Sequence, residues 1–79
     1  MSMENYYSTK DLYLAGFLYA KGIEFGGVKR QGSLCWFIFA DKPTCESLQL
    51  QFFAKSIEVN AKNYSDALRT LKNLLFMNQ

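Results

Sequence analysis

The sequence contains no histidine, two cysteines, one proline and no large excess of either charge. Without histidine the chain lacks the usual general base near neutral pH, so it cannot form a Ser-His-Asp triad or a Cys-His pair by itself. Two cysteines are too few for a four-ligand zinc site or a disulfide framework. Gly26-Gly27 lacks the lysine and helix start of a phosphate-binding loop. We therefore expect a non-enzymatic protein with no metal and no cofactor.

Long hydrophobic runs are also absent from the sequence. The longest apolar stretches, at 12–20 and 34–40, are too short to cross a bilayer. No positively charged segment followed by an apolar one marks a signal peptide. These absences predict a cytoplasmic protein that makes no membrane contact and keeps Cys35 and Cys45 as reduced, buried thiols.

What the sequence does have is apolar and aromatic content. Of its 79 residues, 49% are hydrophobic and 16% are aromatic. A chain this short buries only ~60–65% of its unfolded surface, so it needs a dense core to fold at all. We expect residues 1–79 to form one domain with a loose end at 1–5. The aromatic excess also predicts apolar surface that is left for a partner.

The most informative segment is the unbroken apolar run at 34–40, which reads LCWFIFA. Its aromatic and β-branched residues favour a strand that is covered by other elements. One face of this strand carries Cys35, Phe37 and Phe39, and the other carries Leu34, Trp36, Ile38 and Ala40. If the helices cover only one face, the other becomes a binding surface, and the sequence leaves open which face that is.

The segments before this run predict a helix and a hairpin. A helix is expected to start at 8–11, with Ser8 as its cap, and to run through 12–20 to a stop at Gly22. Gly16 in its middle marks a close approach of another backbone. Residues 23–30 predict a strand bent at Gly26-Gly27, which turns at Gln31-Gly32 into the apolar run.

The segments after the run predict two helices separated by a short strand. Thr44 is expected to cap the first of these helices, and residues 56–60 alternate as a third strand. Asn60 then caps a last helix, whose apolar stripe comprises Ala61, Tyr64, Leu68, Leu71 and Leu75. The order helix, strand, strand, helix, strand, helix predicts an α+β fold, a three-stranded antiparallel sheet packed by about three helices.

Basic residues suggest one kind of site. The net charge is +2, and five cations fall near the hairpin tip and on the last helix: Lys29, Arg30, Lys62, Arg69 and Lys72. A hairpin tip in a groove with a basic helix along the phosphates is a workable mode of nucleic-acid binding. The predicted order of elements loosely resembles the helix–three strands–helix plan of double-stranded RNA-binding domains. It differs by an extra helix between the second and third strands, and Asp66 interrupts the basic stripe on the last helix.

Apolar residues suggest another kind of site. The candidate interface comprises Trp36, Leu74, Phe76 and Met77, because residues 74–77 cover a wider arc of a helix than a small domain hides. We expect an interaction module that acts through protein contacts, including self-association as a homodimer, with nucleic-acid binding as the alternative. Tyr6, Tyr7, Ser8 and Lys10 include the residue types of a Ser/Lys or Tyr/Lys catalytic group, but capping by Ser8 explains their spacing.

Three segments of the sequence support a resemblance. They are 7–15 (YSTKDLYLA), 35–39 (CWFIF) and 59–72 (VNAKNYSDALRTLK). With them the chain resembles a family of small bacterial domains of unknown function, over nearly its whole length. The resemblance implies a compact single domain, and it supplies no activity, cofactor or functional residue.

Overall fold

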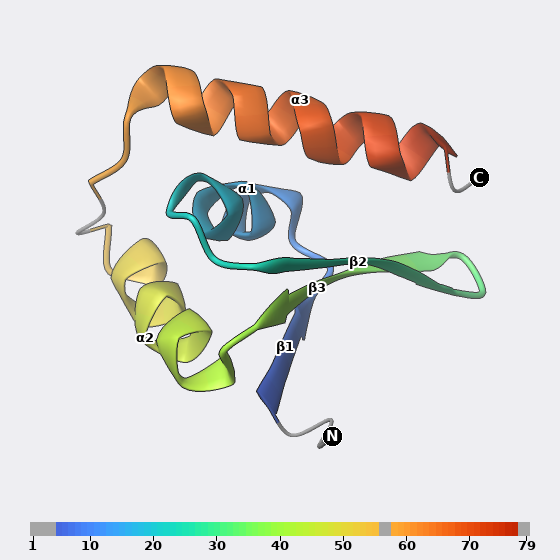
Figure 1. The fold of residues 1–79 in the computed structure, drawn as a ribbon, viewed down its shortest axis with the longest axis horizontal. Coiled ribbons are helices and arrows are strands. Elements are labelled where there is room, and N and C mark those ends of the chain that lie inside the picture. Colours follow the sequence, from blue (N-terminus) through green and yellow to red (C-terminus); the bar gives the residue numbers. More distant parts are fainter. Residues whose placement is uncertain (1–4, 56–57, 78–79) are drawn as a thin grey trace.

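The computed structural model describes residues 5–55 and 58–77 as an antiparallel sheet with helices packed on it (Figure 1). Within these residues the elements are β1 (Tyr6–Thr9), α1 (Leu12–Ala20), β2 (Phe25–Gln31), β3 (Leu34–Ala40), α2 (Lys42–Phe53) and α3 (Ala61–Met77). The three strands and three helices of the described chain confirm the predicted α+β class.

The apolar run forms β3, which is the central strand in the sheet order β1-β3-β2. Its bounds are those predicted from the sequence, and both neighbours pair with it in the antiparallel sense. The predicted bend is confirmed by a register shift between Phe25 and Gly27. Gly32 has a φ of 60°, a left-handed conformation that glycine adopts without steric cost, and it turns the chain from β2 into β3.

The start of the first helix was predicted wrongly. Residues 6–9 form β1, and the cap of α1 is Asp11, whose carboxylate accepts hydrogen bonds from the backbone N–H groups of Tyr13 (2.9 Å) and Leu14 (3.2 Å). Ser8 lies in the strand instead, opposite Ile38. Pairing with β3 gives this edge strand several backbone hydrogen bonds, which outweigh the single hydrogen bond that a Ser8 cap would make.

The third strand was predicted in the wrong place. Ser56 and Ile57 lie outside the described residues, and 58–60 belong to no strand. The sheet is completed by β1, so the element order is strand, helix, strand, strand, helix, helix. Asn60 caps α3 as predicted, because its side chain accepts the N–H of Asn63 at 3.0 Å.

The cap of α2 is Asp41 rather than the predicted Thr44. Asp41 has a φ of 63°, and its carboxylate accepts the backbone N–H of Thr44 at 3.4 Å and the Thr44 hydroxyl at 2.7 Å. The helix therefore begins before Pro43, which lies in its first turn. A backbone N–H at that position would have no acceptor within the helix, so proline costs no helical hydrogen bond there.

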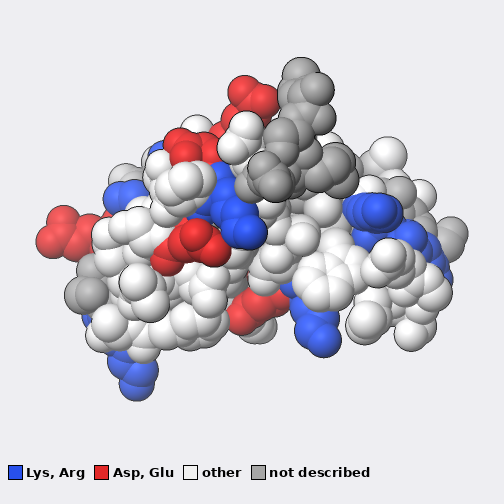
Figure 2. Space-filling model, turned by 90° about the horizontal axis from the view of Figure 1, so that it is seen from below, with Lys and Arg blue, Asp and Glu red and all other residues white. Residues whose placement is uncertain are grey.

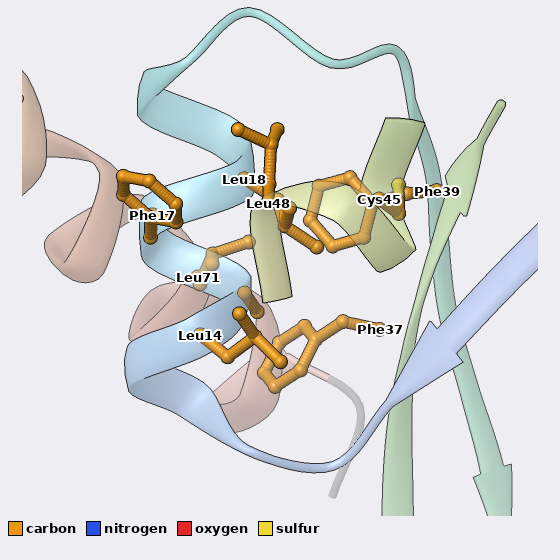
Figure 3. Close-up of a cluster of buried hydrophobic side chains, with 9 residues drawn as sticks. Leu14, Phe17, Leu18, Phe37, Phe39, Cys45, Leu48 and Leu71 are labelled. Carbon is orange, nitrogen blue, oxygen red and sulfur yellow. The ribbon is translucent and has the colours of Figure 1, made fainter. Parts of the chain in front are cut away.

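The helices form layers on one side of the sheet. Figure 1 shows α1 between the sheet and α3, with α2 beside it. The core between them is made by Leu14, Ala15, Phe17, Leu18, Phe37, Phe39, Cys45, Leu48 and Leu71 (Figure 3). No helix of the described chain is long and apolar enough to cross a membrane.

Gly16 allows α3 to lie close against α1. A Cβ atom placed on Gly16 would come within 2.6 Å of Leu68 Cδ2 and 3.3 Å of Tyr64 Cε1, both on α3. Another element does lie close to this glycine, but the prediction of a neighbouring backbone was wrong, because the nearest atoms belong to side chains of α3. Tyr64 also donates its hydroxyl proton to the carbonyl oxygen of Tyr13 at 3.1 Å, which ties the two helices together.

Candidate functional site

The face of the sheet that points away from the helices is the candidate site, and we call it the open face. Phe37 and Phe39 point from β3 into the core, where each is at most 1% exposed (Figure 3). Strand alternation sends Trp36 and Ile38 to the opposite face, on which no helix of the described chain packs. The sequence left open which face of β3 is uncovered, and in the structure it is the face that carries Trp36.

A hollow of about 290 Å³ lies on the open face. The register places Ser8 opposite Ile38 and Lys29 opposite Trp36, so all three strands contribute side chains to one surface. The hollow is lined by Tyr6, Ser8, Lys29, Gln31, Trp36 and Ile38. Its apolar floor and polar rim are typical of a small binding site.

Trp36 is the central aromatic residue of this surface, and it is half-buried. Its indole Nε1 is shielded from solvent and has no hydrogen-bond partner among the described residues. The Nζ atom of Lys10 lies 5.9 Å from the centroid of the ring, within the range of a cation–π interaction. The indole is thus held in place at the floor of the hollow, with a positive charge beside it.

The charge of the open face is positive. Lys29 lines the hollow, Lys10 lies beside the ring of Trp36, and no aspartate or glutamate is among the outward-facing residues of the three described strands. Figure 2, which views the molecule from the side opposite α3, shows lysine and arginine without acidic groups toward the hairpin end, and basic and acidic groups intermixed over the rest of the surface. The surface therefore favours an anionic partner over a cationic one.

The five basic residues predicted as nucleic-acid contacts do not gather on one surface. Lys29 lies on the open face, whereas Arg30 points to the other side of β2 and donates from Nε to the carbonyl of Gly32 at 3.1 Å. Lys62 and Arg69 lie within 3.2 and 3.9 Å of Asp66 on α3. Lys72 is also on α3, which α1 separates from the sheet (Figure 1).

The four residues of the predicted interface fall into separate environments. Trp36 belongs to the open face, and Leu74 is half-buried against the core. Phe76 and Met77 are 72% and 78% exposed at the end of α3. Trp36 and the end of α3 are therefore distinct surfaces of the molecule.

Ile38 was placed on the Trp36 face from the sequence, whereas Tyr6, Ser8 and Gln31 were missed as residues of the open face. The β-forming tyrosines and threonine of 6–9 were the available signal for a strand, but residues 8–11 were interpreted as a helix start. Exposed Leu50 and Phe53 on α2 were also missed as candidate contacts. Leu50 falls off the stripe of Cys45 and Leu48 at helical spacing, which was the available signal.

The two cysteines are free thiols in different surroundings. Cys45 is fully buried and donates its thiol proton to the carbonyl oxygen of Ala40, with a sulfur–oxygen distance of 3.4 Å. Burial, helped by the charges of Asp41 and Glu46, raises the pKa of the Cys45 thiol to about 11. Cys35 is half-buried beside a second hollow of about 360 Å³, between the hairpin and the end of α3. Cys45 is therefore the thiol that behaves as a core residue.

Of the residue types of a catalytic group, Tyr6 and Ser8 line the hollow on the open face together with Lys29, whereas Tyr7 lies on the other face of β1. Ser8 points to the open face and Tyr7 to the core side, where its hydroxyl donates to Gln49 Oε1. Burial and the nearby charges of Cys45, Glu46 and Asp11 raise the pKa of Tyr7. A tyrosinate at that position is disfavoured, so Tyr7 is poorly suited to activate Ser8.

Comparison with known proteins gives a match to a protein family. A protein-family model for a domain of unknown function matches residues 4–77, which is nearly the whole chain. No curated protein and no solved structure matches the chain. The chemistry of the open face must therefore be interpreted from its own residues.

Proposed function

The chain belongs to the DUF5659 family of domains of unknown function, and on this premise we propose that it is a small non-enzymatic interaction module. Its binding surface is the open face of the sheet, and its partner is a protein. The observation that carries the proposal is the division of β3 into a buried face with Phe37 and Phe39 and an uncovered face with Trp36. A tryptophan at the floor of a small hollow is typical of an interface hot spot.

The surroundings of Tyr7 and Cys45 support a role without catalysis. Ser8 and Tyr7 lie on different faces of β1, and the Cys45 thiol is buried with a raised pKa. Among the described residues, the hollow places Tyr6 and Lys29 beside Ser8 but no carboxylate that could act as an acid or a base. A cytoplasmic location is part of the proposal and is supported by the two free thiols, which suit a reducing compartment.

Self-association is a second element of the proposal, at a different surface. Phe76 and Met77 are the most exposed large apolar residues of the described chain, and they adjoin each other at the end of α3. Two such side chains contribute apolar area that a second copy of the chain can cover.

Nucleic-acid binding through the hairpin tip and α3 has less support from the geometry. Asp66 neutralises part of the charge of Lys62 and Arg69, and α3 lies on the opposite side of α1 from the sheet. One duplex would have to contact both sides of the domain to use all five cations.

Site-specific photo-crosslinking in cells tests the protein-binding proposal. A photoreactive phenylalanine replaces Gln31 on the open face or, as the matched control, exposed Gln51 on α2. We expect a discrete protein adduct from position 31 and none from position 51. Equal adducts at both positions, or an adduct removed by nuclease, would contradict the proposal.

A further inference from the structure

We infer that the partner presents an acidic, extended segment to the open face, with one large apolar side chain seated in the hollow over Trp36 and Ile38. The inference rests on the proposed function and specifies the chemistry of the partner. It is argued from the charge, the size of the hollow and the state of the tryptophan ring.

Charge complementarity is the first step. The outward-facing residues of the three strands include Lys29, with Lys10 beside the ring of Trp36, and they include no carboxylate. A segment with glutamate or aspartate on either side of an apolar residue would place negative charge near both lysines. A basic segment would instead be repelled, which gives the face its selectivity.

The size of the hollow is the second step. About 290 Å³ is at the lower end of the range for ligand pockets, ~300–1,000 Å³, so it suits a side chain better than a whole cofactor. Ile38 and Trp36 supply apolar contacts at its floor, and Ser8 and Gln31 supply hydrogen-bonding groups at its rim. Those rim groups can pair with the backbone of an extended peptide lying across the strands.

The state of the tryptophan ring favours a peptide over single-stranded nucleic acid. Base stacking needs an exposed aromatic face, whereas Trp36 is half-buried and has the Lys10 ammonium near its ring. The two lysines can neutralise about two phosphates. On a single strand this corresponds to a slope of only about −1.4 in the logarithm of the binding constant against the logarithm of the salt concentration. An acidic peptide satisfies the same charges and fills the hollow as well.

Trp36 is the only tryptophan of the chain, so its fluorescence reports on this site alone. The probes are a synthetic peptide of glutamates and aspartates around one central phenylalanine, its Phe→Ala version, its lysine-for-acid version and oligothymidine. We expect saturable changes in Trp36 emission with the acidic Phe peptide and weaker ones, by about tenfold in Kd, with the Ala version. The lysine version is expected not to bind.

A matched pair of charge reversals separates local from overall electrostatics. Lys29→Glu on the open face and Lys72→Glu on α3 change the net charge equally. We expect Lys29→Glu to weaken the acidic peptide by about tenfold or more and Lys72→Glu to weaken it by less than about twofold. Circular dichroism checks that both variants keep the wild-type fold.

Three results would overturn the inference: equal effects of the two reversals, equal binding of the lysine peptide, or tighter binding of oligothymidine than of the acidic peptide. Absence of binding up to about 1 mM acidic peptide would do the same. If a protein still crosslinks to position 31 in that case, the proposed function stands and only the acidic character of the partner is wrong.

Discussion

At the scale of single residues, Trp36 and Phe37 show that adjacent residues of one strand belong to the proposed binding surface and to the core. They are neighbours in β3, yet Phe37 is buried beneath the helices and Trp36 faces the open side of the sheet. The reason is the two-residue period of a strand, which sends adjacent side chains to opposite faces. Stability and proposed function are therefore assigned to alternate residues of the same element.

Cys45 supplies a prediction at this scale. Its pKa is raised from 9.0 to about 11 in the folded chain, so the folded state holds the thiol proton more tightly than the unfolded state. The resulting stability is fully present below pH 9 and is lost as the pH rises toward 11. We expect the urea midpoint to fall over this range in the wild type and to fall less in Cys45→Ala.

The Cys35→Ala variant is the control for this effect, because Cys35 is only half-buried. The Cys35→Ala variant should lose as much stability as the wild type when the pH rises from 9 toward 11. An identical pH dependence in Cys45→Ala and the wild type, measured by urea unfolding at several pH values, would refute the role assigned to Cys45.

At the scale of elements, the packing of α1 against α3 depends on the absence of a side chain at Gly16. Glycine in the middle of a helix costs about 1 kcal/mol relative to alanine. The structure explains why it is there, because Leu68 and Tyr64 occupy the space that a Cβ atom would need. The local helix preference is outweighed by the contact between two helices.

We predict that Gly16→Val destabilises the domain by about 2 kcal/mol or more, because its methyl groups force α3 away from α1. Tyr13→Val is the matched control, since it places the same β-branched residue at an exposed position of the same helix. It should cost less than about 1 kcal/mol. Urea unfolding measures both changes, and equal losses would show that the clash with α3 has no effect.

At the scale of the whole molecule, the domain has two separate apolar surfaces on a small body. One is the open face of the sheet, and the other is the end of α3 with Phe76 and Met77. Because the two surfaces do not overlap, self-association through α3 leaves the open face accessible. If both proposals hold, we expect one copy to bind another copy and a partner at the same time.

We predict that the wild-type chain, of 9.1 kDa, shows an average mass that rises with concentration in light scattering. Replacing Phe76 and Met77 by serine should lower the average mass to that of the monomer, because the substitutions remove exposed apolar area from α3. Leu50→Ser on α2, at a residue 71% exposed, is the control and should leave the mass unchanged. A concentration-independent monomer mass for the wild type would refute self-association.

The sequence by itself determined the elements whose signals are local. The apolar run predicts β3 with its bounds, the glycines predict the bulge and the hairpin, and the three- and four-residue spacing predicts α3. Each of these patterns reflects the geometry of a single element, so it can be detected without knowing what packs on it. The two faces of β3 were identified in the same way.

Only the tertiary structure decided how distant segments combine. The pairing of 6–9 with β3, the covering of the Phe37 face rather than the Trp36 face, and the separation of Lys29 from the basic residues of α3 all depend on contacts across the chain. Such contacts depend on the total apolar area that one arrangement of the elements buries, compared with the area that competing arrangements would bury. Every element contributes to this total. Local capping by Ser8 could not compete with that sum, and the open face is what the packing of the helices left uncovered.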